Sequence, residues 1–343
     1  MTRLTYLTKS GVRRQAGRLA VRRIIGISLI GLGTFLVAAG VFVRFYVAPA
    51  LVGAPTDVYQ VTRLQADGAS YLDASSLTVR TGAAVSVTST VRGDVEASGD
   101  DVAVYDSGTI VQDAARGTRI EIQNARYAFD RRTGELRDCC GAAVQGDTNV
   151  RMDGIGLFWP VEARTDDLEV FDTGTRRAWP VVFDGEERVD GLLTYRFVQR
   201  VPATQVAGDV PALPAALFGR PGGGPAVEAS RYYQADITYW IDPRTGAPVD
   251  QRRHVVTTLR PKEGPGSLVV ADLDLRMTQD SREELRAKSD DGAGKIRLLE
   301  AVLPLAAVGL GLPAVVAGLI LTFGEGRRPA RRGSRRARAA AGR

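Results

Sequence analysis

Two long apolar segments near the ends of the chain constrain its fold more than any other feature. Residues 24–43 and residues 301–323 contain no charged side chain. Each reaches the roughly 20 residues that a helix needs to cross about 30 Å of hydrocarbon. A helix satisfies its own backbone hydrogen bonds in lipid, so we expect two transmembrane helices. The residues between them would then form one soluble body that is tethered at both ends.

The distribution of charge predicts on which side of the membrane each part lies. Residues 1–23 carry seven Lys or Arg and no acid, and residues 324–343 carry eight Arg and one Glu. Subtracting these two +7 ends from the net charge of +6 leaves −8 for the residues between them. The positive-inside rule therefore predicts a two-pass protein of the cell (plasma) membrane, with both termini cytoplasmic and the central domain extracytoplasmic. Nucleic acid is not an expected partner, because anionic membrane lipid accounts for the basic ends.

The first apolar segment has a second interpretation. Arg22 and Arg23 precede it, and Ala48-Pro49-Ala50 follows it as an A-x-A-like site, which together resemble a signal peptide. Its apolar run is longer than the usual 7–15 residues of a signal peptide, so we expect an uncleaved anchor. Cleavage stays open at this point.

Small residues recur within both apolar segments, and they allow membrane helices to approach closely. They are Gly26, Gly33 and Gly40 in the first segment, and Ala307, Gly311, Ala314 and Gly318 in the second. One interpretation is that the two segments pack on each other. The alternative is that they dock to a larger membrane machine.

The resulting organisation has six parts. We expect a basic leader at 1–23, a transmembrane helix at 24–43, an extracytoplasmic β domain at 44–279, a polar helix or linker at 280–300, a second transmembrane helix at 301–323 and an Arg-rich tail at 324–343. Ser281-Arg-Glu-Glu284 resembles a capping box that starts the polar helix, which Gly292–Gly294 would interrupt. These boundaries follow from the apolar, basic and proline-rich runs of the sequence.

The central part reads as mainly β. Short segments rich in Val and Thr alternate with polar residues, as at 77–80 and 84–92, and glycine-containing turns separate them. Residues 127–134 and 239–246 share the pattern of a strand that ends in Asp-x-x-Thr-Gly, in which Asp130 and Asp242 act as turn formers rather than catalytic acids. We expect an antiparallel curved sheet or two similar β modules.

Two groups of apolar residues are candidates for a lipid site. The stretch from 156 to 183 is dense in aromatics, which would either fill a core or line an acyl or glycolipid cavity. These candidate cavity residues are Phe158, Trp159, Phe171, Trp179 and Phe183. Residues 202–229 are rich in Pro and Gly and read as a long loop, and long loops of this kind are often functional lids or disordered linkers. Within it, Leu213, Leu217 and Phe218 would cap an apolar cavity or dip into a membrane surface.

The remaining chemistry of the sequence is sparse. Cys139 and Cys140 are adjacent, and in an oxidising compartment they are a candidate disulfide that stiffens the turn at Gly141, with a redox switch as the alternative. The single histidine, His254, and the lack of further Cys argue against a metal site, and no nucleophile elbow or phosphate-binding glycine loop is present. We expect a protein that is not an enzyme and needs no cofactor.

Five stretches of the sequence, taken in this order, resemble one family. They are residues 22–26, 127–141, 156–163, 194–201 and 239–249. Together with the two apolar segments they are similar to an actinobacterial family of porin-PorA-like, two-pass envelope proteins. Relatives in that family are linked to polar growth and to trehalose-monomycolate transport beside an RND-type lipid exporter. The resemblance implies a protein that binds a lipid or glycolipid, with such an exporter or other envelope proteins as partners.

Three functions follow as hypotheses. The first is a non-enzymatic envelope factor that binds membrane lipid or glycolipid and assists its export or envelope assembly. The second is an envelope scaffold that recruits other proteins without a small ligand. The third is a channel, which fits less well because a porin needs a closed barrel with an apolar outer band. An open apolar cavity beneath the aromatic residues would favour the first, and a solid core the second.

Overall fold

The computed structural model describes residues 7–161, 163–221 and 224–324, and the chain forms two compact units. One unit contains the described residues up to 49 and those from 297 onward, and the other contains residues 50–296. The first six residues of the predicted basic leader and nearly all of the predicted Arg-rich tail lie outside the described residues. Residues 162, 222 and 223 also lie outside them.

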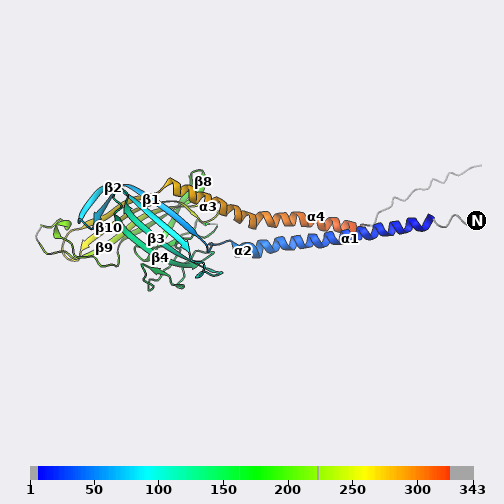
Figure 1. Ribbon diagram of the computed structural model, residues 1–343, viewed down its shortest axis with the longest axis horizontal. Helices are drawn as coiled ribbons and strands as arrows, with labels where there is room; N and C mark the ends of the chain where they lie inside the picture. The colour runs from blue at the N-terminus through cyan, green and yellow to red at the C-terminus, as the bar shows by residue number, and fades with distance from the viewer. Residues whose placement is uncertain (1–6, 162, 222–223, 325–343) are drawn as a thin grey trace, which may run out of the picture. The chain divides into compact units, whose positions relative to one another are not determined.

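Helices begin and end the described chain, and eleven strands lie between them (Figure 1). The N-terminal helical elements are α1 (Leu7–Phe42), the π-helical turn η1 (Val43–Val47) and α2 (Ala48–Leu51). The strands are β1 (Tyr59–Asp73), β2 (Thr78–Gly93), β3 (Val102–Asp113), β4 (Arg119–Asp130), β5 (Ala143–Val144), β6 (Leu168–Asp172), β7 (Arg177–Val189), β8 (Leu192–Gln205), β9 (Ala229–Ile241), β10 (Pro248–Pro261) and β11 (Leu268–Met277), with the 3₁₀ turn η2 (Ala215–Phe218) before β9. The C-terminal elements are α3 (Gln279–Arg297), the π-helical turn η3 (Leu298–Val302) and α4 (Leu303–Phe323).

All eleven strands form a single antiparallel sheet that curls into a half-barrel, in the order β5-β4-β3-β2-β1-β11-β10-β9-β8-β7-β6. The expectation of an antiparallel curved sheet is therefore confirmed, and the alternative of two β modules is wrong. The two predicted short strands at 77–80 and 84–92 are one continuous strand, β2, because it pairs with β1 on both sides of Gly82. Sheet hydrogen bonds along a neighbouring strand outweigh the local break that the glycine signals.

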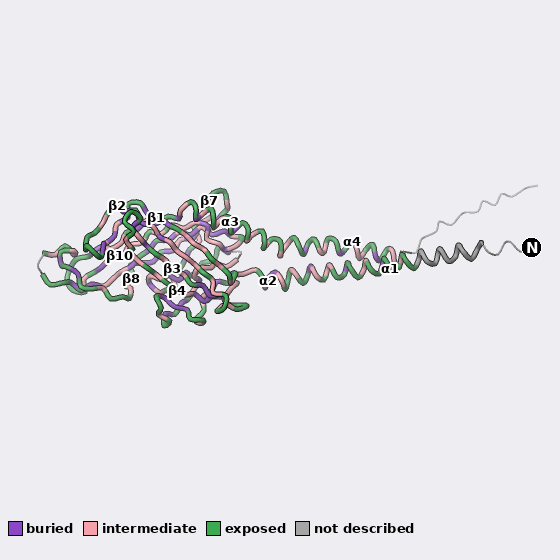
Figure 2. The backbone as a smooth tube through the Cα atoms, in the orientation of Figure 1, coloured by how far each residue is buried: buried purple, intermediate pink, exposed green. Residues whose placement is uncertain are grey.

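The residues between β4 and β6 link the two outer edges of the sheet. Isolated bridges pair Phe129 with Leu136, Glu135 with Ile155, and Ile155 with Val170 of β6. Backbone pairing therefore passes from β4 to β6 through this segment, which covers edges that would otherwise be free to pair with other chains. Buried residues concentrate in the β unit, whereas the terminal helices are mostly exposed (Figure 2).

The polar helix α3 belongs to the β unit and is held there by hydrogen bonds. The backbone N–H of Arg63 on β1 donates to Ser281 Oγ at 2.9 Å, and Ser289 Oγ donates to Asp242 Oδ2 at 2.7 Å. The predicted capping box at Ser281 is wrong, because the helix begins at Gln279 and Thr278 Oγ1 accepts the Ser281 N–H. The predicted interruption at Gly292–Gly294 is also absent, and the helix continues through it to Arg297.

The two repeated turns form as the sequence predicts. Asp130 Oδ1 accepts the backbone N–H groups of the residues two and three positions later, at 2.9 and 3.0 Å. Asp242 Oδ1 accepts the N–H of Arg244 at 2.9 Å, and Gly134 and Gly246 have φ of 75° and 72°. Both Asp residues are turn formers, and because both turns lie in one sheet they do not mark separate modules.

In the helical unit, α1 and α4 pack against each other along their small residues. A Cβ added at Gly33 would lie 2.6 Å from the carbonyl oxygen of Gly311, and one added at Gly318 would lie 2.6 Å from that of Gly26. The glycines therefore allow direct contact between the two backbones. This arrangement supports the interpretation that the predicted membrane segments pair with each other.

Both of these helices are long and apolar enough to cross a membrane. The candidate spans are Ala20–Val47 and Gln279–Phe323, the second of which includes α3. Only 17% and 11% of their most apolar windows are buried, so neither is the core helix of a soluble fold. We therefore treat the chain as a membrane protein.

Candidate functional site

A polar cavity of about 120 Å³ lies on the inner face of the half-barrel. Its walls come from β3 and β4 on one side, and from the β6–β7 turn, the residues just after β8, and β9 on the other. Elements far apart in sequence therefore meet there, because the curl of the sheet turns its two outer parts toward each other. The lining includes Ser107 and Gln123 from the first wall and Thr173 and Ala207 from the second.

An ion pair joins the two walls of the cavity. Arg231 Nη2 on β9 lies 3.0 Å from Glu121 Oε1 on β4, and Gln123 Nε2 also donates to that oxygen at 3.0 Å. Both charged side chains are about one-third exposed, so water reaches the pair. A polar or charged ligand that enters here would displace this water and form its own hydrogen bonds with these groups.

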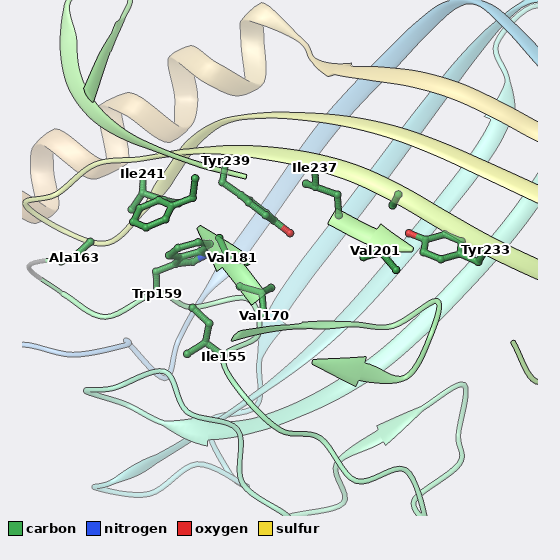
Figure 3. Close-up of a cluster of buried hydrophobic side chains, with 12 residues drawn as sticks. Ile155, Trp159, Ala163, Val170, Val181, Val201, Tyr233, Ile237, Tyr239 and Ile241 are labelled. Carbon is green, nitrogen blue, oxygen red and sulfur yellow. The ribbon is translucent and has the colours of Figure 1, made fainter. Parts of the chain in front are cut away.

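Deeper in the half-barrel, buried tyrosines surround the floor of the cavity. Burial raises the pKa of Tyr127 and Tyr233 far above the ordinary value, and nearby Asp172 raises both further. Tyr233 donates to Asp172 Oδ2 at 3.2 Å, and the Tyr239 hydroxyl donates to Gln199 Oε1 at 3.1 Å. Figure 3 shows that the Tyr233 and Tyr239 hydroxyls point toward one another along β9. These hydroxyls stay protonated at physiological pH and remain hydrogen-bond donors.

The five aromatic residues proposed as a lipid lining lie in the packed core. Trp159 is 2% exposed, and its ring centroid lies 5.1 Å from Phe197 and 5.4 Å from Tyr239. The other four lie in the same core or the adjacent one: Phe158 stacks on Phe129, Phe183 contacts Tyr195 and Phe197, Phe171 is buried, and Trp179 packs against the Trp159 cluster. None of the five lines the polar cavity or either of two other cavities in the described residues. A role for them in contacting acyl chains stays a prediction.

The proposed lid residues form a small core of their own. Leu213 and Phe218 are buried against Leu259 and Leu268, at the ends of β10 and β11, and Leu217 is half-buried beside them. The stretch 202–229 is less loop-like than predicted, because β8 extends to Gln205, Leu213 pairs with Val227, and η2 lies between them. The apolar side chains turn into the domain, since burial there removes them from water.

The cysteines and the single histidine lie away from the polar cavity. Cys139 and Cys140 form a vicinal pair in a turn that Ala142 N–H closes onto the Cys139 carbonyl at 3.0 Å. Their pairing as a disulfide in the cell stays a prediction. His254 lies on the outer face of β10, where its Nε2 is 2.9 Å from Asp272 Oδ1.

Sequence reasoning did not identify the residues of the polar cavity. Glu121 and Gln123 alternate with Ile120 and Ile122, which predicts a two-faced strand but does not say which face turns inward. Most strands of a half-buried sheet place apolar residues inward, and here the polar residues of β4 face the interior. The alternation of polar and apolar residues along β4 was the only hint in the sequence that one face of this strand is polar.

A comparison with protein families identifies the family to which the chain belongs. The model of the family described as Porin PorA matches residues 25–320, from the first apolar helix to the last. No curated protein matches the chain. The matched region covers most of the sequence and includes the complete half-barrel, so the chain belongs to the Porin PorA family.

Proposed function

We propose that this protein is a non-enzymatic, two-pass envelope protein whose half-barrel binds the polar part of a membrane lipid or glycolipid on its inner face. In this proposal both termini are cytoplasmic and the half-barrel is extracytoplasmic, as the basic ends and the acidic centre favour. Anchoring at both ends keeps the site near the membrane. The binding step would serve lipid export or envelope assembly beside a fixed partner, for which an RND-type exporter is the candidate.

The polar cavity is the observation that carries this proposal. Its hydroxyl, amide and charged groups suit a headgroup or sugar, while the neighbouring aromatic core is already filled by side chains. We therefore propose that the protein holds its ligand by the polar part. This mode of binding differs from the enclosure of an acyl chain beneath the sheet. Acyl chains would remain in the membrane or at the edge of the domain.

A channel is the second candidate, because the description of the matched family favours it. The outer face of the half-barrel argues against insertion of the sheet into lipid. Arg252 pairs with Asp274 at 2.8 Å on that face, and His254 pairs with Asp272. The outward face of a membrane barrel is instead an apolar band. Conductance of the full-length protein in planar bilayers, abolished by substitutions within α1 or α4, would favour the channel.

Blocking the cavity mouth tests lipid binding. Ala207 is exposed and lines the cavity, so Ala207→Trp fills the mouth without disturbing the core. We expect about tenfold less lipid to co-purify with the full-length variant in mild detergent, since a loss of about 1.4 kcal/mol of binding lowers affinity tenfold. Mass spectrometry of the extracted lipids, normalised to protein, measures this.

Ala203→Trp provides the matched control. Ala203 is exposed on β8 but does not line the cavity. The wild-type protein and Ala203→Trp should therefore recover the same lipid in equal amounts. A wild-type protein that is repeatedly lipid-free, or equal recovery with Ala207→Trp, contradicts the proposed function.

A further inference from the structure

Arg253 is a charged side chain that the sheet turns toward its interior. It lies at the centre of β10, opposite Ile237 on β9 and Leu275 on β11. Both of these partners are buried, at 1% and 5% exposure. Its neighbours along the strand, Arg252 and His254, point to the outer face and form ion pairs there. Arg253 therefore belongs to the inner face, because successive side chains of a strand alternate between faces.

Within the described residues, no carboxylate lies within 4 Å of the Arg253 guanidinium, and its buried Nε has no hydrogen-bond partner. Three other arginines also have a buried Nε without a partner, and each is paired through its other nitrogens: Arg22, Arg196 and Arg282. Arg253 instead lies beside the neutral hydroxyl of Tyr239. Arg253 is half-buried and its guanidinium is always charged, so its partial removal from water without a counter-charge is unfavourable. An anion from outside the chain would supply that counter-charge.

Three tyrosines and one carboxylate lie around Arg253. Arg253 lies close enough to Tyr127, Tyr233 and Tyr239 to lower the pKa that burial has raised in each. The nearest carboxylate, Asp172, is engaged elsewhere: Oδ1 accepts from the Thr175 N–H at 2.7 Å and Oδ2 accepts from Tyr233. The charge of Asp172 reduces the positive potential at Arg253 but does not occupy the guanidinium.

We propose that Arg253 is the anchor of an oxyanion-binding site inside the half-barrel, beside the Tyr233 and Tyr239 side chains. The ligand group is a phosphate or carboxylate, whose oxygens match the planar donor fork of arginine. Tyr233 also lines the polar cavity, which connects this site with the mouth where Ala207 lies. This proposal rests on the proposed function only for the idea that the oxyanion belongs to a lipid headgroup.

The test compares two neighbouring arginines in the full-length protein in detergent. Arg253→Met removes the inward charge and keeps an unbranched apolar side chain, while Arg252→Met removes the same charge from the outer face. The probes are inorganic phosphate, and phosphatidic acid or oleate delivered in micelles, with binding measured by calorimetry. We expect the wild-type protein and Arg252→Met to bind, and Arg253→Met to bind at least about tenfold more weakly, because a charge-assisted hydrogen bond is worth about 1.5–3 kcal/mol.

Stability of the ligand-free protein provides a second measurement. A half-buried cation without a carboxylate partner opposes folding, so Arg253→Met should unfold at the same temperature as the wild-type protein or a higher one once bound anions are removed. A structural role for Arg253 predicts a lower unfolding temperature instead. A lower temperature together with unchanged binding of phosphate and both amphiphiles overturns the proposal, as does the absence of binding of all three probes to the wild-type protein.

The results with the three probes also distinguish failure of the oxyanion site from failure of the proposed function. Binding of phosphatidic acid or oleate that depends on Arg253 supports a headgroup site, and binding of inorganic phosphate alone supports a site for a free anion. If lipid co-purifies equally with wild type and Arg253→Met, the proposed function stands and the oxyanion site is wrong. If the wild-type protein binds phosphate but carries no lipid, the oxyanion site stands and the lipid function is wrong.

Discussion

Replacement of Trp159 by alanine should destabilise the half-barrel by about 3–5 kcal/mol, the range that is typical of large aromatic truncations in a core. Trp159 is nearly inaccessible to water and contacts the rings of Phe197 and Tyr239. Alanine would leave a cavity among these groups that the sheet cannot close. Urea unfolding of the full-length protein in detergent, followed by tryptophan fluorescence and circular dichroism, measures the change in the free energy of unfolding.

Trp240→Ala is the matched control for this prediction. Trp240 follows Tyr239 on β9, is half-buried on the outer face, and donates its Nε1–H to Glu187 Oε2 at 2.9 Å. The same truncation should therefore cost clearly less there. A small cost for Trp159→Ala, accompanied by loss of co-purified lipid, would instead indicate that Trp159 lines an open lipid cavity.

A second large effect is expected in the helical unit, where Gly33→Leu should separate α1 from α4. The added Cβ alone would lie 2.6 Å from the Gly311 carbonyl oxygen and 2.9 Å from the Val315 nitrogen. Backbone atoms cannot move aside as a flexible side chain can, and overpacking of a close contact costs about 1–3 kcal/mol. Gly31→Leu is the control, because a Cβ at Gly31 meets nothing within 4 Å.

Cysteine cross-linking measures the separation of the two helices. A Cβ at Gly40 would lie 3.0 Å from the Ala307 Cβ, slightly closer than a disulfide needs, so a small shift of the helices should let cysteines at these two positions form one in the wild-type background. A protease site inserted after Asp209 allows the chain to be cut into two halves. If the cross-link has formed, the two halves stay together on a non-reducing gel. We expect the halves to separate with Gly33→Leu and to stay linked with Gly31→Leu. Equal cross-linking in both variants would show that the pair of helices does not depend on this contact.

The sequence predicted the parts of the fold that depend on local pattern. The apolar segments predicted α1 and α4, alternation predicted the strands, and the repeated Asp-x-x-Thr-Gly predicted the turns at Asp130 and Asp242. The same turn chemistry recurs at Asp113 and Asp172, whose Oδ1 atoms accept backbone N–H groups two or three residues later. Recognising these additional turns would have shown that β3 and β6 end in the same way as β4 and β9.

The features that the sequence did not predict depend on distant contacts. The start of α3 at Gln279 rather than Ser281 follows from the contact of Ser281 with Arg63 on β1, which lies more than two hundred residues away. The cavity depends on the curl that brings β4 near β9, as the Glu121–Arg231 pair shows. No local pattern marks Arg253 as inward, because its strand carries charged residues on both faces.

Hydrogen–deuterium exchange tests most directly whether the inner cavity is where a ligand binds. The full-length protein in nanodiscs of zwitterionic lipid would be measured before and after addition of lipids extracted from the membranes in which it is expressed. We predict new protection in three segments that are distant in sequence but share the cavity: residues 119–127, 173–176 and 205–207. The exchange rate of the outward-facing hairpin around Gly191 should stay the same after lipid is added. Protection confined to the outer face, or to α1 and α4, would contradict the account.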